Sequence, residues 1–218
     1  MTYIPNWQDI WTKVSYGQTM WFLVALTAGL VLLSFLVRSR ATLKFDLRTT
    51  LYLQRLSTPL LDRLAKAFTW LGNATTLIPL GVGAAGLCFF KEEGVAGMFI
   101  LASLLALPIN AVLKKIFKRE RPGEKDVRIH EGPRWGLSYP SGHSMGSTAL
   151  YASLGFYFWI LVPDSTLRYS LVAIFFVIPI LVAASRVYLG AHWVSDVVGG
   201  IAAGLIVVTL IAAAYPVG

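Results

Sequence analysis

Charged residues are scarce in this chain of 218 residues: they make up 14% of the sequence, whereas hydrophobic residues make up 56%. A soluble domain has roughly 25% charged residues, so this composition excludes an ordinary soluble protein. Six stretches contain no charged residue at all: Val14–Val37, Ala67–Phe90, Gly94–Leu113, Trp135–Pro163, Tyr169–Ser185 and Val197–Gly218. A helix that crosses a bilayer needs about 20 apolar residues and at least about 17. The sequence therefore predicts an all-α integral membrane protein, a bundle of six transmembrane helices.

Cysteine is nearly absent as well. Cys88 is the only one, so no disulfide can form within the chain and the redox compartment cannot be inferred. The segment Met1–Lys13 lacks the basic stretch and small-residue cleavage site of a secretory signal, so we expect the first apolar run to stay as an anchor. Without repeats or linkers, residues 1–218 are expected to form a single membrane domain.

The expected transmembrane helices cover about Met20–Val37, Thr75–Phe90, Val95–Phe117, Ser141–Val162, Leu167–Tyr188 and Ala191–Ala214. Between the first two, leucines alternate with basic residues over Thr42–Phe68, a pattern typical of short amphipathic helices at the membrane interface. Pro59 divides this segment, and Ser57 or Thr58 can cap the helix that follows. A packed re-entrant helix pair without any role in binding lipids fits the same pattern equally well.

Three short polar clusters interrupt the apolar sequence. They are Lys114 with Arg121-Pro122, the stretch Pro140-Ser141-Gly142-His143, and Ser185-Arg186 with His192 and Asp196. Ionisable groups are costly inside a membrane, so their presence there indicates a functional site. Six alternating helices would place the end of the third, the start of the fourth, the end of the fifth and the start of the sixth on one membrane face. We therefore expect all three clusters to meet.

The residue types in these clusters suit a phosphate group. His192 and Asp196 are four residues apart, so on one helical face they can hydrogen-bond, and the free ring nitrogen is left as a nucleophile or a base. Ser141, Gly142 and His143 begin a helix, where free backbone N–H groups bind anions. The adjacent cations, of which arginine matches phosphate oxygens best, are Lys114, Arg121 and Arg186.

Other readings of the polar residues are less favoured. Two histidines and an aspartate have acceptable spacing for a metal site, but three neighbouring cations would repel the metal ion. The net charge of +8 is also found in nucleic-acid-binding proteins, but no soluble basic domain remains outside the helices. We expect Lys115, Lys118 and Arg119 to face lipid headgroups, and His130 to be a solvated surface histidine.

Taken together, the clusters resemble the three-part signature of the type 2 phosphatidic acid phosphatase (PAP2) superfamily, complete and in order. The resemblance implies that His192 attacks phosphorus to form a phosphohistidine and that Asp196 orients it. It implies that His143 is the general acid towards the leaving group and then helps to activate water. It assigns the phosphoryl oxygens to Lys114, Arg121, Ser141, Gly142 and Arg186. The resemblance implies no metal and no other cofactor.

The expected substrate is a membrane lipid that carries a phosphate. Undecaprenyl pyrophosphate ranks first by a narrow margin, ahead of phosphatidylglycerol phosphate, phosphatidic acid and lipid A. A lipid phosphotransferase remains open, because a phosphohistidine can pass its phosphoryl group to either acceptor. An anion channel would also collect cations at one face, but it needs no paired His192 and Asp196 opposite His143. Vanadium haloperoxidases share the three-part site but are soluble.

The sidedness of the site is a question on which the sequence and the resemblance disagree. The face with the clusters carries sixteen lysines and arginines, against three on the opposite face. The positive-inside rule would place that face in the cytoplasm. Bacterial members of the resembled family typically open to the periplasm or the exterior. We expect the periplasmic side of the bacterial cytoplasmic (inner) membrane, because phosphate and headgroup binding explain several of the cations.

Overall fold

The computed structural model describes residues 16–130 and 136–214, and in these residues the fold is helical apart from one isolated antiparallel bridge between Glu120 and Leu137. The helices are α2 (Tyr16–Arg38), α3 (Leu43–Arg55), α4 (Pro59–Leu71), α5 (Ala74–Phe90), α6 (Gly94–Ser103), α7 (Ala106–Phe117), α8 (Gly142–Leu161), α9 (Ser165–Tyr188) and α10 (Val194–Ala214). The predicted all-α class is confirmed.

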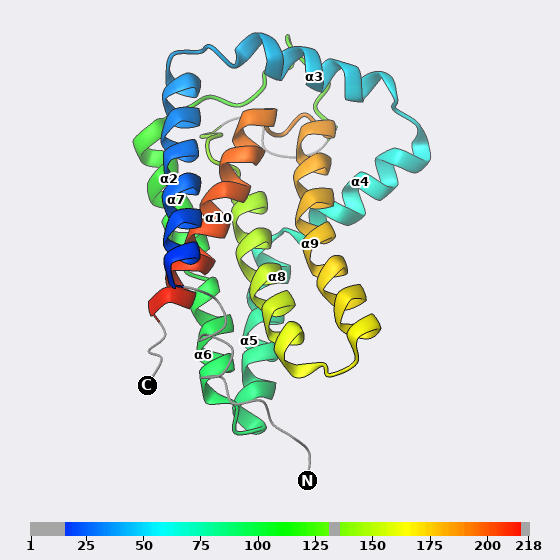
Figure 1. The fold of residues 1–218 in the computed structure, drawn as a ribbon. Coiled ribbons are helices and arrows are strands. Elements are labelled where there is room, and N and C mark those ends of the chain that lie inside the picture. The colour runs from blue at the N-terminus through cyan, green and yellow to red at the C-terminus, as the bar shows by residue number, and fades with distance from the viewer. Residues whose placement is uncertain (1–15, 131–135, 215–218) are drawn as a thin grey trace.

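Helices α8, α9 and α10 run side by side through the molecule, and α2 lies against α10 (Figure 1). Helix α3 lies across one end of this bundle, and α4 leads back from it along α9 (Figure 1). The first turns of α8 and α10 and the last turns of α7 and α9 are at the same end (Figure 1). The predicted meeting of the polar clusters at one end is therefore observed.

The predicted number of six membrane-spanning helices is not confirmed by the length and apolarity of the described helices. By length and apolarity, four segments of the described chain can cross a membrane: Gly17–Arg38, Gly94–Phe117, Ser165–Tyr188 and Val194–Ala214. The bent pair α4–α5 would make a fifth span. Helix α8 is long enough, with 20 residues, but is less apolar, because it contains polar residues such as Ser144, Ser147 and Ser153; most of its residues are buried by its neighbours. A helix surrounded by other helices does not need the apolarity that lipid contact demands.

The segment between α2 and α5 divides at Pro59 as predicted. Pro59 is the first residue of α4, where its missing N–H costs nothing, and Thr58 caps the helix by accepting a hydrogen bond from the Leu61 amide (3.2 Å). Helices α4 and α5 then meet at an angle of 49°. At this bend a Cβ on Gly72 would lie 2.5 Å from the Val182 side chain, so glycine allows α4 to approach α9 closely.

The predicted helix Val95–Phe117 is interrupted, with α6 ending at Ser103 and α7 beginning at Ala106. Pro108 explains the interruption, because proline cannot donate the hydrogen bond that residue 104 would otherwise accept. Pro179, by contrast, lies inside α9 without ending it. The break in α6–α7 leaves the polar last turn of α7 at the same end as the first turn of α8.

Candidate active site

His192 and Asp196 are paired, but not in the way that their spacing predicted. Helix α10 begins only at Val194, so His192 precedes the helix instead of sharing a helical face with Asp196. Asp196 is in the first turn and accepts a hydrogen bond from the Trp193 amide (2.9 Å), which folds the chain back over the helix start. His192 Nδ1 lies 3.4 Å from Asp196 Oδ2 and 3.3 Å from Ser138 Oγ.

The environment of His192 keeps its imidazole neutral. The side chain is 1% exposed, and this burial lowers its pKa from 6.5 to about 4, although the hydrogen bond to Asp196 acts in the opposite direction. The Nδ1 atom faces the carboxylate, so the ring proton belongs there and the lone pair is on Nε2. Arg121 Nη1 lies 3.4 Å from that Nε2 atom. The site therefore presents an unprotonated nitrogen beside a cation.

Asp196 is held by more partners than the sequence indicated. Ser138 donates a short hydrogen bond to its Oδ2 atom, and Arg119 Nη1 lies 2.7 Å from Oδ1. The carboxylate is fully buried, and a buried charge is stable only when it is paired and hydrogen-bonded. With Oδ2 directed at His192 and Oδ1 at Arg119, Asp196 has one orientation available to it.

Arg119 corrects the expectation that it faces lipid headgroups. Its side chain is only 12% exposed and bridges two fully buried carboxylates from different helices, Asp196 on α10 and Asp46 on α3, at 2.7 Å each. Asp46 in turn accepts hydrogen bonds from the Ser195 amide (2.9 Å) and hydroxyl (2.6 Å). Helix α3 is therefore connected by ion pairs through Arg119 to the carboxylate behind His192.

The start of α8 forms the opposite wall of the site. Ser141 is the N-cap residue and its Oγ accepts from the Ser144 amide (3.4 Å), as the sequence predicted for a helix start. Glycine is required at the next position, because a Cβ on Gly142 would lie 2.8 Å from Asn110 Oδ1. The same point lies 3.9 Å from Lys114 Nζ, which places this ammonium group at the helix N-terminus.

His143 and Arg186 complete the site from two further helices. His143 Nε2 is hydrogen-bonded to Asn73 Oδ1 (2.6 Å) at the bend between α4 and α5. Arg186, which is 3% exposed, donates from Nη1 to Thr69 Oγ1 (2.6 Å) on α4. Arg121 donates to the Ala191 carbonyl (2.8 Å). Helix α4 and its junction with α5 thus hold two of the predicted site residues in place.

All eight predicted site residues are located at this end of the bundle: Lys114, Arg121, Ser141, Gly142, His143, Arg186, His192 and Asp196. Sequence reasoning missed the residues that hold them: Asp46, Thr69, Asn73, Arg119 and Ser138. The lone aspartate among the basic residues of α3 is a signal that could have been noticed. His130, expected to be solvated, stacks instead on Tyr188, with ring centroids 5.9 Å apart.

A comparison with known families matches the PAP2 superfamily model to residues 95–217, more than half of the chain. The chain belongs to the PAP2 superfamily. Its activity follows from the names of its relatives, which are phosphatases, and it is accordingly a phosphoric monoester hydrolase of the lipid phosphatase family, embedded in the membrane.

Three relatives and one solved structure illustrate this. Phosphatidylglycerophosphatase B of Bacillus subtilis is 34% identical over 155 residues, covering 70% of this chain and 74% of the relative. Lipid A 4'-phosphatase of Porphyromonas gingivalis is 29% identical, covering 68% and 64%. Decaprenylphosphoryl-5-phosphoribose phosphatase of Mycolicibacterium smegmatis is 32% identical, covering 45% and 48%. The crystal structure of a PAP2-type phosphatidylglycerolphosphate phosphatase from Bacillus subtilis superposes with a TM-score of 0.78 at 29% identity, covering 87% and 94%.

Proposed function

We propose that this protein hydrolyses a lipid phosphate through a phosphohistidine on His192, without a metal ion. The observation that carries the proposal is the direction of the His192 ring: Nδ1 faces Asp196 and Ser138, and Nε2 faces Arg121 (3.4 Å). A neutral nitrogen with a fixed lone pair beside a cation is suited to attack a phosphoryl group whose negative oxygens the cation neutralises.

In the first step, His192 Nε2 forms a bond to phosphorus while the bond between phosphorus and the lipid oxygen breaks. The bound phosphate dianion offsets the charge of the neighbouring cations and so favours a protonated His143, which gives its proton to that leaving oxygen. In the second step, water attacks phosphorus, the N–P bond breaks, and His143 takes the proton from the water. The charge on the transferring oxygens is balanced by the ammonium of Lys114 and the guanidinium groups of Arg121 and Arg186, with the amides at the start of α8.

For the substrate, we propose phosphatidylglycerol phosphate first. A relative and a solved structure that resemble this chain over most of its length both bear that activity in their names. Undecaprenyl pyrophosphate, ranked first from the sequence, stays a prediction, and the relative named for a decaprenyl lipid keeps polyprenyl substrates as the second candidate. Water is the proposed acceptor because the relatives are phosphatases.

The substrate assay is release of inorganic phosphate by the purified protein in detergent. Phosphatidylglycerol phosphate, undecaprenyl pyrophosphate and phosphatidic acid would be compared with EDTA in excess. We expect release in the presence of EDTA, fastest from phosphatidylglycerol phosphate, because arginine and lysine side chains supply the positive charge that a metal would otherwise provide. Activity that disappears with EDTA and returns with a divalent cation would contradict the metal-independent mechanism.

We also propose that the site faces the periplasm or the exterior. In a Cys88→Ala background, cysteines would be introduced singly at Lys125, in the loop at the site's end, and at Lys91, in the turn between α5 and α6 at the other end. Both positions are exposed, whereas Cys88 is buried. In intact cells an impermeant thiol reagent should label K125C and spare K91C. The reverse pattern would place the site in the cytoplasm, as the distribution of charges predicts.

A further inference from the structure

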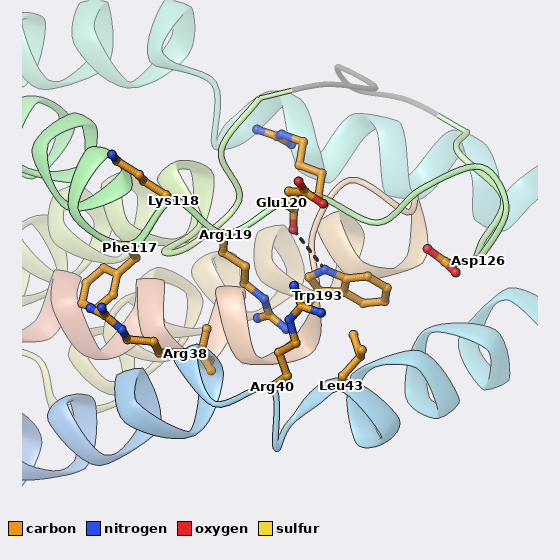
Figure 2. Close-up of a pocket in the computed structure, with 11 residues that line it drawn as sticks. Arg38, Arg40, Leu43, Phe117, Lys118, Arg119, Glu120, Asp126 and Trp193 are labelled. Carbon is orange, nitrogen blue, oxygen red and sulfur yellow. Dashed lines mark hydrogen bonds between the residues drawn. The ribbon is translucent and has the colours of Figure 1, made fainter.

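A second cationic pocket adjoins the proposed active site. It has a volume of about 400 Å³ and lies between the end of α2, the start of α3 and the end of α7 (Figure 2). We call it the α2–α7 pocket. Five of its lining residues are cations: Arg38, Arg40, Lys118, Arg119 and Arg121. Two carboxylates, Glu120 and Asp126, also line it, so the pocket carries an excess of positive charge.

The cations of the pocket differ in whether they already have a partner. Arg119 is paired with two buried carboxylates, and Arg121 donates to a backbone carbonyl. The side chains of Arg38, Arg40 and Lys118 have no carboxylate within 4.0 Å anywhere in residues 16–130 or 136–214. Figure 2 shows Arg40 reaching from the turn between α2 and α3 towards Trp193, whereas the side chains of Arg38 and Lys118 point away from Trp193. Unpaired cations around a pocket favour an anionic ligand.

Two of these cations follow helix ends in the left-handed backbone conformation. Arg40 has a φ of 60° and Lys118 a φ of 48°, the left-handed region in which a side chain with a Cβ is disfavoured and glycine or asparagine is usual. In the described chain the one other non-glycine residue with positive φ is Glu92, in the turn at the opposite end. All three residues lie one or two positions beyond the end of a helix, where a left-handed residue is common, so this conformation indicates no function by itself. At the pocket it fixes the backbone from which the Arg40 and Lys118 side chains extend.

The pocket and the active site share residues. Arg121 lines the pocket, and its Nη1 atom lies 3.4 Å from His192 Nε2. Trp193, the next residue after His192, also lines the pocket, and its indole N–H donates to the Glu120 carbonyl (3.3 Å). A lipid whose phosphoryl group is at His192 can therefore place a neighbouring anionic group in the pocket.

We propose that the α2–α7 pocket is a second phosphate-binding subsite, in which Arg40 and Lys118 bind a lipid phosphate other than the one transferred to His192. The proposal rests on the proposed function. The second phosphate can belong to the substrate itself, because phosphatidylglycerol phosphate and undecaprenyl pyrophosphate both carry two phosphates, whereas phosphatidic acid carries one. Alternatively, it can be the phosphodiester of a neighbouring anionic lipid. Both sources offer the same chemistry to a guanidinium group.

The test variant is Arg40→Asn combined with Lys118→Asn, since asparagine removes the charge and tolerates positive φ. The measured quantity is the ratio of kcat/KM for phosphatidylglycerol phosphate to kcat/KM for phosphatidic acid. If the second phosphate belongs to the substrate, this ratio should fall about tenfold, the effect of losing one hydrogen bond to a charged group. If it belongs to a neighbouring lipid, the ratio stays the same, but added phosphatidylglycerol should stimulate the parent protein more than the variant.

Two control variants test whether a general loss of positive charge, or a change at any residue with positive φ, has the same effect as the loss of Arg40 and Lys118. Arg48→Gln with Arg63→Gln removes two exposed cations that do not line the pocket, and Glu92→Asn changes the third residue with positive φ. Neither control should change the ratio or the stimulation. Unchanged ratio and stimulation in the test variant would overturn the subsite.

A direct binding measurement distinguishes a pocket that binds no phosphate from a protein that lacks the proposed phosphatase activity. Short-chain phosphatidylglycerol, which has a phosphodiester and no phosphate monoester, should raise the Tm of the His192→Asn protein in detergent. The rise should disappear when Arg40→Asn and Lys118→Asn are added. Equal rises with and without these two changes would overturn the subsite even if the parent protein hydrolysed none of the lipids tested.

Discussion

Replacing His192 by asparagine is expected to lower kcat by about 10⁴-fold or more, since losing the nucleophile from a set of residues that act together removes most of the rate enhancement. Asparagine keeps a side-chain N–H that can reach Asp196 and Ser138, so the buried network around Oδ2 retains a partner. We therefore expect the variant to fold normally. Its KM should change little, because the cationic groups that bind the phosphate remain.

The matched control is His130→Gln. His130 is at the same end of the molecule, but its ring stacks on Tyr188 and not on any residue of the site. This variant should retain the activity of the parent protein. Phosphate release by His192→Asn at a rate close to that of His130→Gln would exclude His192 as the nucleophile.

Replacing Arg119 by glutamine is expected to destabilise the protein by about 3–5 kcal/mol, because breaking a buried ion pair leaves uncompensated charge. Here one change leaves two buried carboxylates, Asp46 and Asp196, without their shared cation. We expect a lower Tm in detergent together with a lower kcat, since Asp196 is then free to turn away from His192. Lysine at this position should recover part of the stability but cannot bridge two carboxylates 2.7 Å away with the same geometry.

A double variant distinguishes positioning of Asp196 from a purely structural role of Arg119. Asp46→Asn combined with Arg119→Gln removes one of the two stranded charges and keeps an acceptor for the Ser195 amide. Its Tm should be higher than that of Arg119→Gln alone, whereas kcat should stay low with KM little changed. If kcat recovered along with Tm, Arg119 would serve the fold only. The control is Lys115→Gln, an exposed cation on α7 that should leave both quantities unchanged.

Much of this site could be predicted because its chemistry is carried by local motifs. Ser141, Gly142 and His143 are adjacent, and the cap that Ser141 forms depends only on the residues that follow it. That the three clusters meet at one end could be predicted because an even number of helices separates each cluster from the next. This prediction does not depend on the exact number of spans, since α4 and α5 together carry the chain from the site's end of the bundle to the opposite end (Figure 1).

The residues that hold the site could not be predicted, because their partners are distant in sequence. Arg119 and Asp46 are 73 residues apart, and Arg119 and Asp196 are 77 apart. In a basic stretch beside a membrane, an arginine ordinarily faces headgroups, and only the packing of α3 over α10 gives this one a different partner. Helix α8 was predicted as a helix, but its position in the middle of the bundle was not, and this burial allows it to be more polar than a lipid-facing helix.

The measurement that tests the central claim most directly is detection of ³²P bound to the protein during turnover. The lipid is labelled with ³²P at its terminal phosphate, and the reaction is stopped rapidly without acid. The account predicts protein-bound label that is stable in base and labile in acid, as a phosphoramidate is, and that maps to His192. The label should be absent from His192→Asn and present in His130→Gln. Turnover without any protein-bound label, or label on a carboxylate or a hydroxyl, would contradict the account.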